Sequence, residues 1–314
     1  MKANVNFLNV GWGDSHIIQL PSGKITLMDG GDGALTDEQD HPLKWMNRNQ
    51  INHLDLMILT HLHEDHLNGL VDIVKQKSVH TAILPYKPFN LPNIQEVHFN
   101  GNEGAQRVFN MLKRYLDFIA LLEEQGTTIK WRSEYATKED SVVWSENGFV
   151  LTHIYPWEGD PLPAYHTLQE FLVGLESISD KEIAALEHFF IKSNDDCSVY
   201  RLLVDSNPDE NILFGGDQLE KGWKLLASRT SLKSQIWKVS HHGMKDAFTK
   251  EVLELIQPEY CVIPISEDRS SFLHTHWDEL RLLTEAPFYL TGSIHNGDSF
   301  QLFDGKSLNV QIGY

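Results

Sequence analysis

The sequence predicts an α+β fold in which strands predominate at both ends of the chain and helices predominate in the middle. Apolar runs of strand length recur before about residue 85 and again after about residue 195, and several end at Gly, Asp or His. The segment 86–190 instead has mostly the apolar spacing of helices, interrupted by prolines. The chain has 314 residues, 41 % of them apolar, which suffices for a substantial core.

The N-terminal part predicts a strand pair followed by a strand-to-helix turn. Residues 7–20 and 24–31 alternate as paired strands and are separated by the turn Pro-Ser-Gly. The run LDLMILT at 54–60 predicts a buried strand, and residues 66–77 have helical spacing. The turn between them, at 61–66, contains three histidines and two acids within six residues.

The segment 86–190 is predicted to be a helical insertion or lid within a single domain, 1–314. It contains a long helix at 104–126, strand-like runs at 128–131 and 149–155, and helices around 166–175 and 181–191. Because it lies between the histidine-rich turn and the later motifs, we expect it to pack beside the active edge and restrict access.

The C-terminal part predicts strands that alternate with helices and end in polar residues. Strands are expected at 198–205, 211–217, 235–243, 260–266 and 287–294, with helices at 248–256 and 277–284. Asp29, Asp217, His241 and His242 each follow an apolar strand. A single strand-end Asp is more often a turn or cap residue, but several coincident ends indicate that the strands converge on one edge of a sandwich.

The histidine-rich turn has the composition of a site for two metal ions. His61 and His63 can face one point, and Asp65 and His66 a neighbouring one, where the strand turns into the helix. Zinc and manganese accept imidazole nitrogen and carboxylate oxygen, and two ions about 3.5–4 Å apart activate water and hold a leaving oxygen. The alternative is a polar loop with accidental histidines, which the density of HxHxDH makes improbable.

Composition restricts the classes of protein. The formal charge of −18 weighs against a protein that coats duplex nucleic acid, although local basic faces are compatible with it. Two cysteines provide neither a disulfide framework nor a metal-thiolate spacing. The apolar runs are shorter than a membrane span, so we expect a cytoplasmic protein without membrane contact.

The motifs resemble those of the metallo-β-lactamase superfamily, and most closely the hydrolase domain of ComEC-type competence proteins and their soluble relatives. They lie in residues 1–80 and 190–314, as FLNVGWGDSHII, LMDGG, THLHEDHLNGL, NDDCSVYRLL, LFGGD, KVSHHG and HTHWDEL. The resemblance implies an αββα sandwich of two β-sheets flanked by helices, with the metals at one edge.

The resemblance also implies a ligand set. His61 and His63 would bind the first metal, Asp65 and His66 the second, and Asp217 would bridge the two. One histidine of SHHG would complete the second site. We expect His242 in that role and His241 at the substrate or leaving group, and the reverse assignment stays open. Asp29 would hold ligand residues in orientation without binding a metal itself. Asp65 or Asp217 would also orient the attacking water.

Two further roles have to be assigned: the remaining ligand of the first metal and the function of His274. Many superfamily members have a histidine where this chain has Asn194, Asp195 and Asp196, and Asp196 is the preferred substitute ligand, with zinc or manganese as the metal. His274 is expected to contact phosphate or protonate a leaving group, against the alternative of a solvated helix start.

The leading hypothesis is a dinuclear metal-dependent phosphodiesterase, in particular a nuclease that prefers single-stranded or short nucleic acid. Trp157 and Trp277 are candidates for stacking on bases. The first alternative is a small-molecule phosphodiesterase acting on a cyclic nucleotide or phosphocholine ester. The second is a regulatory or binding module of a multi-protein defence system with a weakened metal site and a protein partner encoded nearby.

Overall fold

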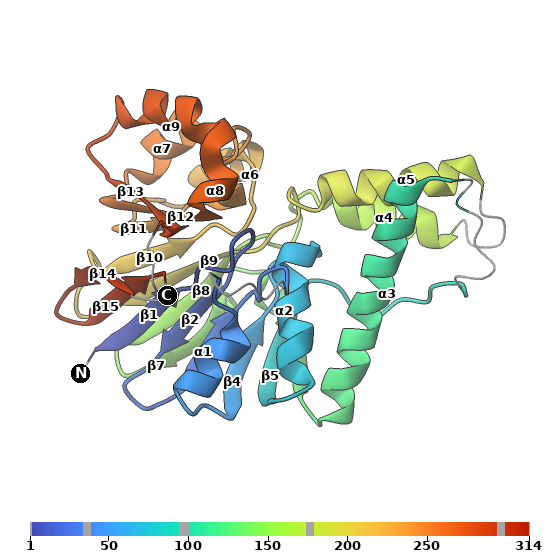
Figure 1. Cartoon of the computed structure of the whole chain (residues 1–314), viewed down its shortest axis with the longest axis horizontal. Helices are drawn as coiled ribbons and strands as arrows, with labels where there is room; N and C mark the ends of the chain where they lie inside the picture. The colour runs from blue at the N-terminus through green and yellow to red at the C-terminus, as the bar shows by residue number, and fades with distance from the viewer. Residues whose placement is uncertain are drawn as a thin grey trace.

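Two mixed β-sheets face each other, and helices cover their outer faces (Figure 1). The structure is a computed structural model that describes residues 2–33, 39–93, 99, 101–173, 179–293 and 299–313. This is the α+β sandwich that the sequence predicted. No helix within these ranges is long and apolar enough to cross a membrane.

The first sheet has eight strands in the order β14-β15-β1-β2-β3-β4-β5-β6. Neighbours pair in antiparallel fashion from β1 to β3 and between β14 and β15, and in parallel from β3 to β6 and between β15 and β1. The strands are β1 (Ala3–Phe7), β2 (His16–Gln19), β3 (Ile25–Met28), β4 (His53–Ile58), β5 (Ser78–Leu84), β6 (Thr128–Trp131), β14 (Phe300–Asp304) and β15 (Leu308–Ile312).

The second sheet has seven strands in the order β13-β12-β11-β10-β9-β8-β7. Strands β10 to β13 pair in parallel, whereas β7 to β10 pair in antiparallel fashion. The strands are β7 (Val142–Glu146), β8 (Phe149–Tyr155), β9 (Val199–Val204), β10 (Asn211–Phe214), β11 (Ile236–Lys238), β12 (Tyr260–Ser266) and β13 (Phe288–Gly292).

The helices form two groups, one on each sheet (Figure 1). Those on the side of the first sheet are α1 (Pro42–Arg48), α2 (Glu64–Val74), α3 (Glu103–Glu124), α4 (Pro163–Val173) and α5 (Asp180–Lys192). Those on the second are α6 (Glu220–Ala227), α7 (Lys250–Ile256), α8 (Glu267–Ser270) and α9 (His274–Arg281). Short 3₁₀ turns follow β6, β11 and α8, at Arg132–Tyr135, Ser240–Gly243 and Ser271–Leu273.

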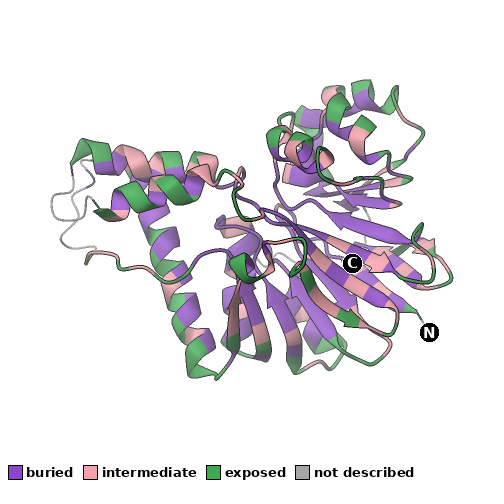
Figure 2. Ribbon diagram, turned by 180° about the vertical axis from the view of Figure 1, so that it is seen from behind, coloured by how far each residue is buried: buried purple, intermediate pink, exposed green. Residues whose placement is uncertain are grey.

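Alternating side chains build the core between the sheets. In β1, Ala3, Val5 and Phe7 are buried while the residues between them are partly exposed. Inward residues of the second sheet, such as Ile212 in β10 and Val262 in β12, join them in one cluster. Figure 2 shows this burial concentrated where the two sheets meet. The period of two residues therefore assigns one face of β1 to the sandwich interior.

The segment 86–190 is only partly the helical insertion that the sequence predicted. Its strands β6, β7 and β8 are integral members of the two sheets, so the middle of the segment belongs to the sandwich. The helices α3 and α4 both pack against α5, and all three extend the apolar cluster of the first sheet. Residues 94–98, 100 and 174–178 lie outside the described ranges. The lid function stays a prediction, now for these helices alone.

Candidate metal centre

The strand ends that carry the motifs meet at one edge of the sandwich. In the first sheet, β3 ends just before Asp29, and β4 ends before the turn that leads into α2. In the second sheet, β10 ends before Asp217, and its parallel neighbour β11 ends before the SHHG turn. Parallel pairing within each sheet places these carboxyl ends side by side.

Two groups of side chains among the described residues have ligand atoms close enough to hold an ion. One consists of His61, His63 and Asp217, and the other of Asp14, His66, Asp217 and His242. Within each group the ligand atoms all lie within 4.8 Å of one another. Because Asp217 belongs to both, the groups are adjacent and share a carboxylate.

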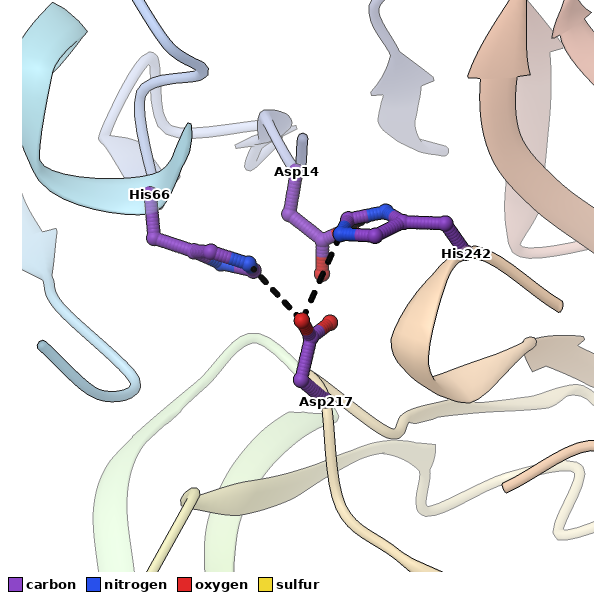
Figure 3. A group of neighbouring side chains, drawn as sticks. All are labelled: Asp14, His66, Asp217 and His242. Carbon is purple, nitrogen blue, oxygen red and sulfur yellow. Dashed lines mark ion pairs between the residues drawn. The ribbon is translucent and has the colours of Figure 1, made fainter. Parts of the chain in front are cut away.

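The histidines converge on the Asp217 carboxylate. Its Oδ2 lies 3.3 Å from Nε2 of His66, 3.3 Å from Nε2 of His242 and 3.9 Å from Nε2 of His61. Figure 3 shows His66 and His242 approaching this carboxylate from different sides. Asp65 adds a second oxygen, with Oδ2 3.0 Å from Nε2 of His242 and 3.8 Å from Nε2 of His66.

Each imidazole is held through the ring nitrogen that faces away from the cluster. Such contacts set the tautomer and leave the other nitrogen free to bind a cation. The pairs are His66 Nδ1 with Asp29 Oδ2 (2.9 Å), His61 Nδ1 with Thr60 Oγ1 (3.1 Å), His63 Nε2 with the Phe190 carbonyl (3.0 Å) and His242 Nδ1 with the Pro264 carbonyl (3.1 Å). The structure thus places Asp29 behind His66, where an orienting residue would lie.

The donor set fits divalent metal ions. Nε2 of His61, Nε2 of His66 and Oδ1 of Asp217 are buried and have no hydrogen-bond partner. Buried polar atoms without partners are costly, and these three point into one cluster. Imidazole nitrogen and carboxylate oxygen are ligands for both zinc and manganese, so the donor set is compatible with either metal.

The carboxylates of the cluster create a negative potential that favours a bound positive charge. Burial opposes the charged form of His66, but the Asp217, Asp29 and Asp65 carboxylates raise the pKa of His66 well above its usual range. Against the same opposition from burial, Asp217 and Asp65 raise the pKa of His242 to about 10. Protons therefore neutralise the carboxylates when no cation is bound, and divalent ions would replace them.

His61 and His63 behave differently because each lies next to other imidazoles. Burial, together with the neighbouring His66 and His63, lowers the pKa of His61 well below its usual value. Burial likewise lowers the pKa of His63. Both rings are therefore neutral at pH 7, which is the state that binds a metal ion.

Two glycines permit the close approaches on which the centre depends. A Cβ on Gly13 would lie 2.2 Å from the Asp65 carbonyl oxygen, and one on Gly216 would lie 2.4 Å from Cys197 Sγ. Both glycines have positive φ, +120° and +48°. His241 and His242 also have positive φ, at 48° and 51°, which is uncommon for residues other than glycine and is typical of functional sites.

A cavity of about 440 Å³ opens at this edge. Its lining combines aromatic and aliphatic groups, ligand candidates, further polar and acidic side chains and two arginines. The lining residues are Trp12, Asp32, His63, Glu64, Asp65, Arg107, Phe190, Ile191, Asn194, Asp217, Leu219, His241, His242, Asp246 and Arg269.

His241 lies in the cavity wall, beside the two groups. Its Nδ1 is 2.8 Å from Asp246 Oδ1, and its Nε2 is 3.1 Å from Asn194 Nδ2. The Asp246 carboxylate accepts a hydrogen bond from the Nδ1–H group of His241. The other ring nitrogen, Nε2, is then unprotonated and accepts a hydrogen bond from the Asn194 amide. The structure therefore brings His242 into a ligand group and places His241 toward the substrate space.

The structure corrects the prediction that Asp196 replaces the missing histidine. Asp196 is buried outside both groups, and its carboxylate accepts from Tyr86 Oη at 2.9 Å and from the backbone N–H groups of Ala164 and Tyr165 at 3.1 and 2.9 Å. These contacts occupy both carboxylate oxygens and join the start of α4 to the core. Asn194, two residues earlier, lines the cavity instead.

Three other predicted residues lie away from the cavity. His274 is exposed and its Nε2 is 3.0 Å from Ser270 Oγ, so the solvated helix start describes it better than a substrate contact. Trp277 is fully buried and donates to the Gly243 carbonyl, and it therefore belongs to the core. Trp157 packs under Arg229.

Sequence reasoning missed Asp14. It is the last residue of FLNVGWGD, a motif to which no ligand was assigned. The signal was present in the pattern, because Asp14 is a polar residue between an apolar strand and the strand that follows. Only the packing of the β1–β2 loop against Asp65 brings it to the cluster, where the Asp14 N–H donates to the Asp65 carbonyl at 3.3 Å.

The chain resembles one known protein family over part of its length. The family model of the metallo-β-lactamase superfamily matches residues 13–154. No curated protein matches the sequence. Similar solved structures include the metallo-β-lactamase fold protein YhfI from Bacillus subtilis, with 10 % identity over 92 % of this chain and 96 % of that one and a TM-score of 0.46.

Two other solved structures are similar to the same extent. A diphosphatase from the PhnP family has 14 % identity over 92 % of this chain and 84 % of that one, with a TM-score of 0.43. CmlA, a diiron β-hydroxylase from Streptomyces venezuelae, has 11 % identity over 94 % of this chain and 53 % of that one, with a TM-score of 0.45. The family-model match covers less than half of the chain. Two mixed sheets flanked by helices, with a buried His/Asp cluster at their edge, are consistent with the metallo-β-lactamase fold, which typically serves metal-dependent hydrolases.

Proposed function

We propose that this protein is a dinuclear metal-dependent phosphodiesterase that acts as a nuclease on single-stranded or short nucleic acid. The observation that carries the proposal is the Asp217 carboxylate shared by two adjacent ligand groups. Two divalent ions held in this way would supply Lewis acidity on both sides of a displacement at phosphorus, one side for the attacking water and the other for the leaving oxygen.

The chain's own residues have separate tasks in this scheme. His61 and His63 would hold one ion, His66 and His242 the other, and Asp217 both. Asp65 lines the cavity with a carboxylate that remains partly exposed, so it can also accept a hydrogen bond from the attacking water.

His241 supplies an imidazole at the cavity wall. Asp246 fixes its orientation through Nδ1, and the Nε2 atom faces the Asn194 amide. A phosphate or leaving-group oxygen that entered this wall would replace the amide and accept a hydrogen bond from Nε2 when the imidazole is protonated. We assign His241 to the contact with the phosphate or its leaving group on this basis.

The cavity walls suit a nucleotide unit. The Trp12 ring lies 5.2 Å from that of His242, and the Phe190 ring lies 4.3 Å from that of His63, so an aromatic face stands beside each ligand group. Aromatic faces stack on bases of any sequence. These two residues replace Trp157 and Trp277 as the candidates for stacking.

Two arginines are the cavity's strongly basic groups. Arg107 pairs with Glu64 and lies 5.5 Å over the Phe190 ring, and Arg269 lies 3.6 Å from Asp32. Guanidinium groups donate several hydrogen bonds to phosphate oxygens, so both are suited to a phosphate next to the scissile one.

The motif resemblance to ComEC-type hydrolase domains supports nucleic acid as the substrate. The charge of −18 opposes a long duplex more strongly than a flexible strand that enters one cavity. The cavity volume favours a second candidate of the same chemistry, a small phosphodiester such as a cyclic nucleotide or phosphocholine ester, because about 440 Å³ would enclose such a molecule.

One substrate panel tests the proposal. Labelled single-stranded DNA, single-stranded RNA, duplex DNA, cyclic dinucleotides and a phosphocholine ester are each incubated with zinc or manganese, with His63→Ala as the control that lacks a ligand. We expect metal-dependent cleavage of the single strands that His63→Ala abolishes. Cleavage of the small molecules alone would move the assignment to the second candidate. A metal-replete protein that cleaves nothing would favour the regulatory module.

A further inference from the structure

Lys238 is a lysine buried inside the metal centre. It is the last residue of β11, and its side chain has 0 % exposure. Its ammonium forms an ion pair with Asp14, donates to the Gly216 carbonyl at 2.8 Å and lies 3.9 Å from Asp217 Oδ1. A buried charge is costly unless it is paired and hydrogen-bonded, and Lys238 meets both conditions.

Asp14 serves as the counterion of Lys238. Its Oδ2 contacts the ammonium, and its Oδ1 is 3.6 Å from Nδ1 of His242. His242 directs its other nitrogen, Nε2, to Asp217 and Asp65. Asp14 therefore lies behind the His242 ring, although its carboxylate is close to the ligand group (Figure 3).

Contacts to the backbone hold the turn that presents Asp217. Gly216 has φ +48° and no room for a side chain against Cys197. The Asp217 N–H donates to Cys197 Sγ at 3.0 Å. The Gly216 carbonyl accepts from Lys238 Nζ and also from the His241 N–H, at 3.1 Å. Lys238 thus fixes the peptide group just before Asp217 and joins it to the SHHG turn.

We propose that Lys238 is a positioning residue: it holds the Gly216–Asp217 turn so that the Asp217 carboxylate can serve both ions. The inference rests on the proposed dinuclear site and adds to it a residue that is not a ligand. Asp14 balances the charge of the ammonium, which the Gly216 carbonyl also holds, and in this scheme neither Lys238 nor Asp14 is a required ligand.

The charge of Lys238 and its positioning role predict opposite changes in metal affinity when Lys238 is removed. By Coulomb's law alone, a cation next to Asp217 repels divalent ions, so its removal should tighten metal binding. If Lys238 positions Asp217, its removal should weaken binding, because the shared carboxylate loses its fixed orientation. The sign of the change therefore separates the two effects.

The experiment compares Asp14→Asn with Asp14→Asn/Lys238→Met. Both lack the counterion, so they differ only in Lys238, and the double variant contains no unpaired buried charge at this position. Binding of Mn²⁺ alone is measured by competition with a chromophoric chelator, and bound metal is counted by elemental analysis. We expect two ions in Asp14→Asn and an at least tenfold weaker affinity in the double variant. Equal or tighter binding in the double variant overturns the proposal, as does loss of an ion in Asp14→Asn.

Thermal unfolding provides a second measurement for variants that are too unstable for a metal titration. Ligands that bind only the folded state raise the unfolding temperature in proportion to the logarithm of concentration, so the midpoint is followed against Mn²⁺ concentration. A rise in the double variant that begins at the same concentration as in Asp14→Asn overturns the proposal. A rise that begins at tenfold higher concentration supports it.

Arg132→Met is the matched control for loss of a buried cation. Arg132 is also buried and pairs with Asp196 at 3.9 Å, outside both ligand groups. This variant should unfold at lower temperature and still bind two ions with unchanged affinity. Because every measurement uses metal alone, failure of this inference is separate from failure of the proposed function, which would show as absent hydrolysis by the wild-type protein.

Discussion

The Asp29→Asn substitution should weaken binding of the second ion without changing the shape of the site. The Asp29 carboxylate accepts three hydrogen bonds, from Thr60 N at 2.8 Å, Thr60 Oγ1 at 2.8 Å and His66 Nδ1 at 2.9 Å. Asn has nearly the same volume and tolerates the positive φ of 58° at this position. The substitution therefore changes the hydrogen bonding and the charge of this side chain while keeping its shape.

The amide can satisfy only part of this arrangement. Thr60 N can only donate, so the amide oxygen of Asn must face it, and the NH₂ group then faces His66 Nδ1. That nitrogen has to become an acceptor, and the His66 proton moves to Nε2, the atom that faces Asp217. A protonated Nε2 cannot bind a metal ion. Loss of such orienting contacts costs about 10- to 100-fold in metal affinity, or about 1.4–2.8 kcal/mol.

The assay is Mn²⁺ or Zn²⁺ titration of metal-free protein, with the unfolding temperature measured in parallel. Asp40→Asn is the control, because Asp40 is also buried and pairs with Arg48 at 2.6 Å outside the centre. It should lower the unfolding temperature and leave both affinities unchanged. Wild-type affinity for both ions in a folded Asp29→Asn protein would refute the tautomer argument.

Four further outcomes are expected. Asp217→Ala should abolish binding of both ions, as counted by elemental analysis, while circular dichroism stays native; retention of one ion would contradict a shared ligand. Arg107→Gln should raise KM for an oligonucleotide about fivefold to tenfold with kcat unchanged, and the difference should shrink at high salt. His274→Ala should leave turnover and metal content unchanged, since His274 is exposed and bonded to Ser270. The metal-free protein should lose stability as pH rises from about 6.5 towards 10, because an unfolded His titrates near 6.5 whereas the folded-state pKa of His242 is about 10; saturating metal should remove this dependence of the unfolding temperature on pH.

The fold was largely predictable because the local pattern and the tertiary structure agree. The run 54–60 became β4, and the long apolar spacing at 104–126 became α3 at Glu103–Glu124. The prediction was wrong for part of the segment 86–190, which contains both helices and strands but was treated as a single insertion. Strands β7 and β8 lie within the predicted insertion, but β8 pairs with β9 and β7 with β8, which makes both of them part of the second sheet.

The positions of the ligand candidates were predictable for a similar reason. His61, His63 and His66 occur within one turn, so local geometry alone brings them together. Asp196 and Asn194 could not be ranked in this way. They are two residues apart, and only the packing of α4 and Tyr86 against Asp196 decides which of them faces the cavity.

By itself the sequence determined the alternating strands, the strand-to-helix turn with its three histidines and the polar residues at the strand ends, because all of these depend on spacing within a few residues. The tertiary structure alone decided that Asp217 is shared, that Lys238 and Asp14 are a buried pair behind it and that Arg107 and Phe190 enter the cavity wall. These contacts join residues far apart in the chain, and their formation depends on how the two sheets and their helices pack, which no local pattern encodes.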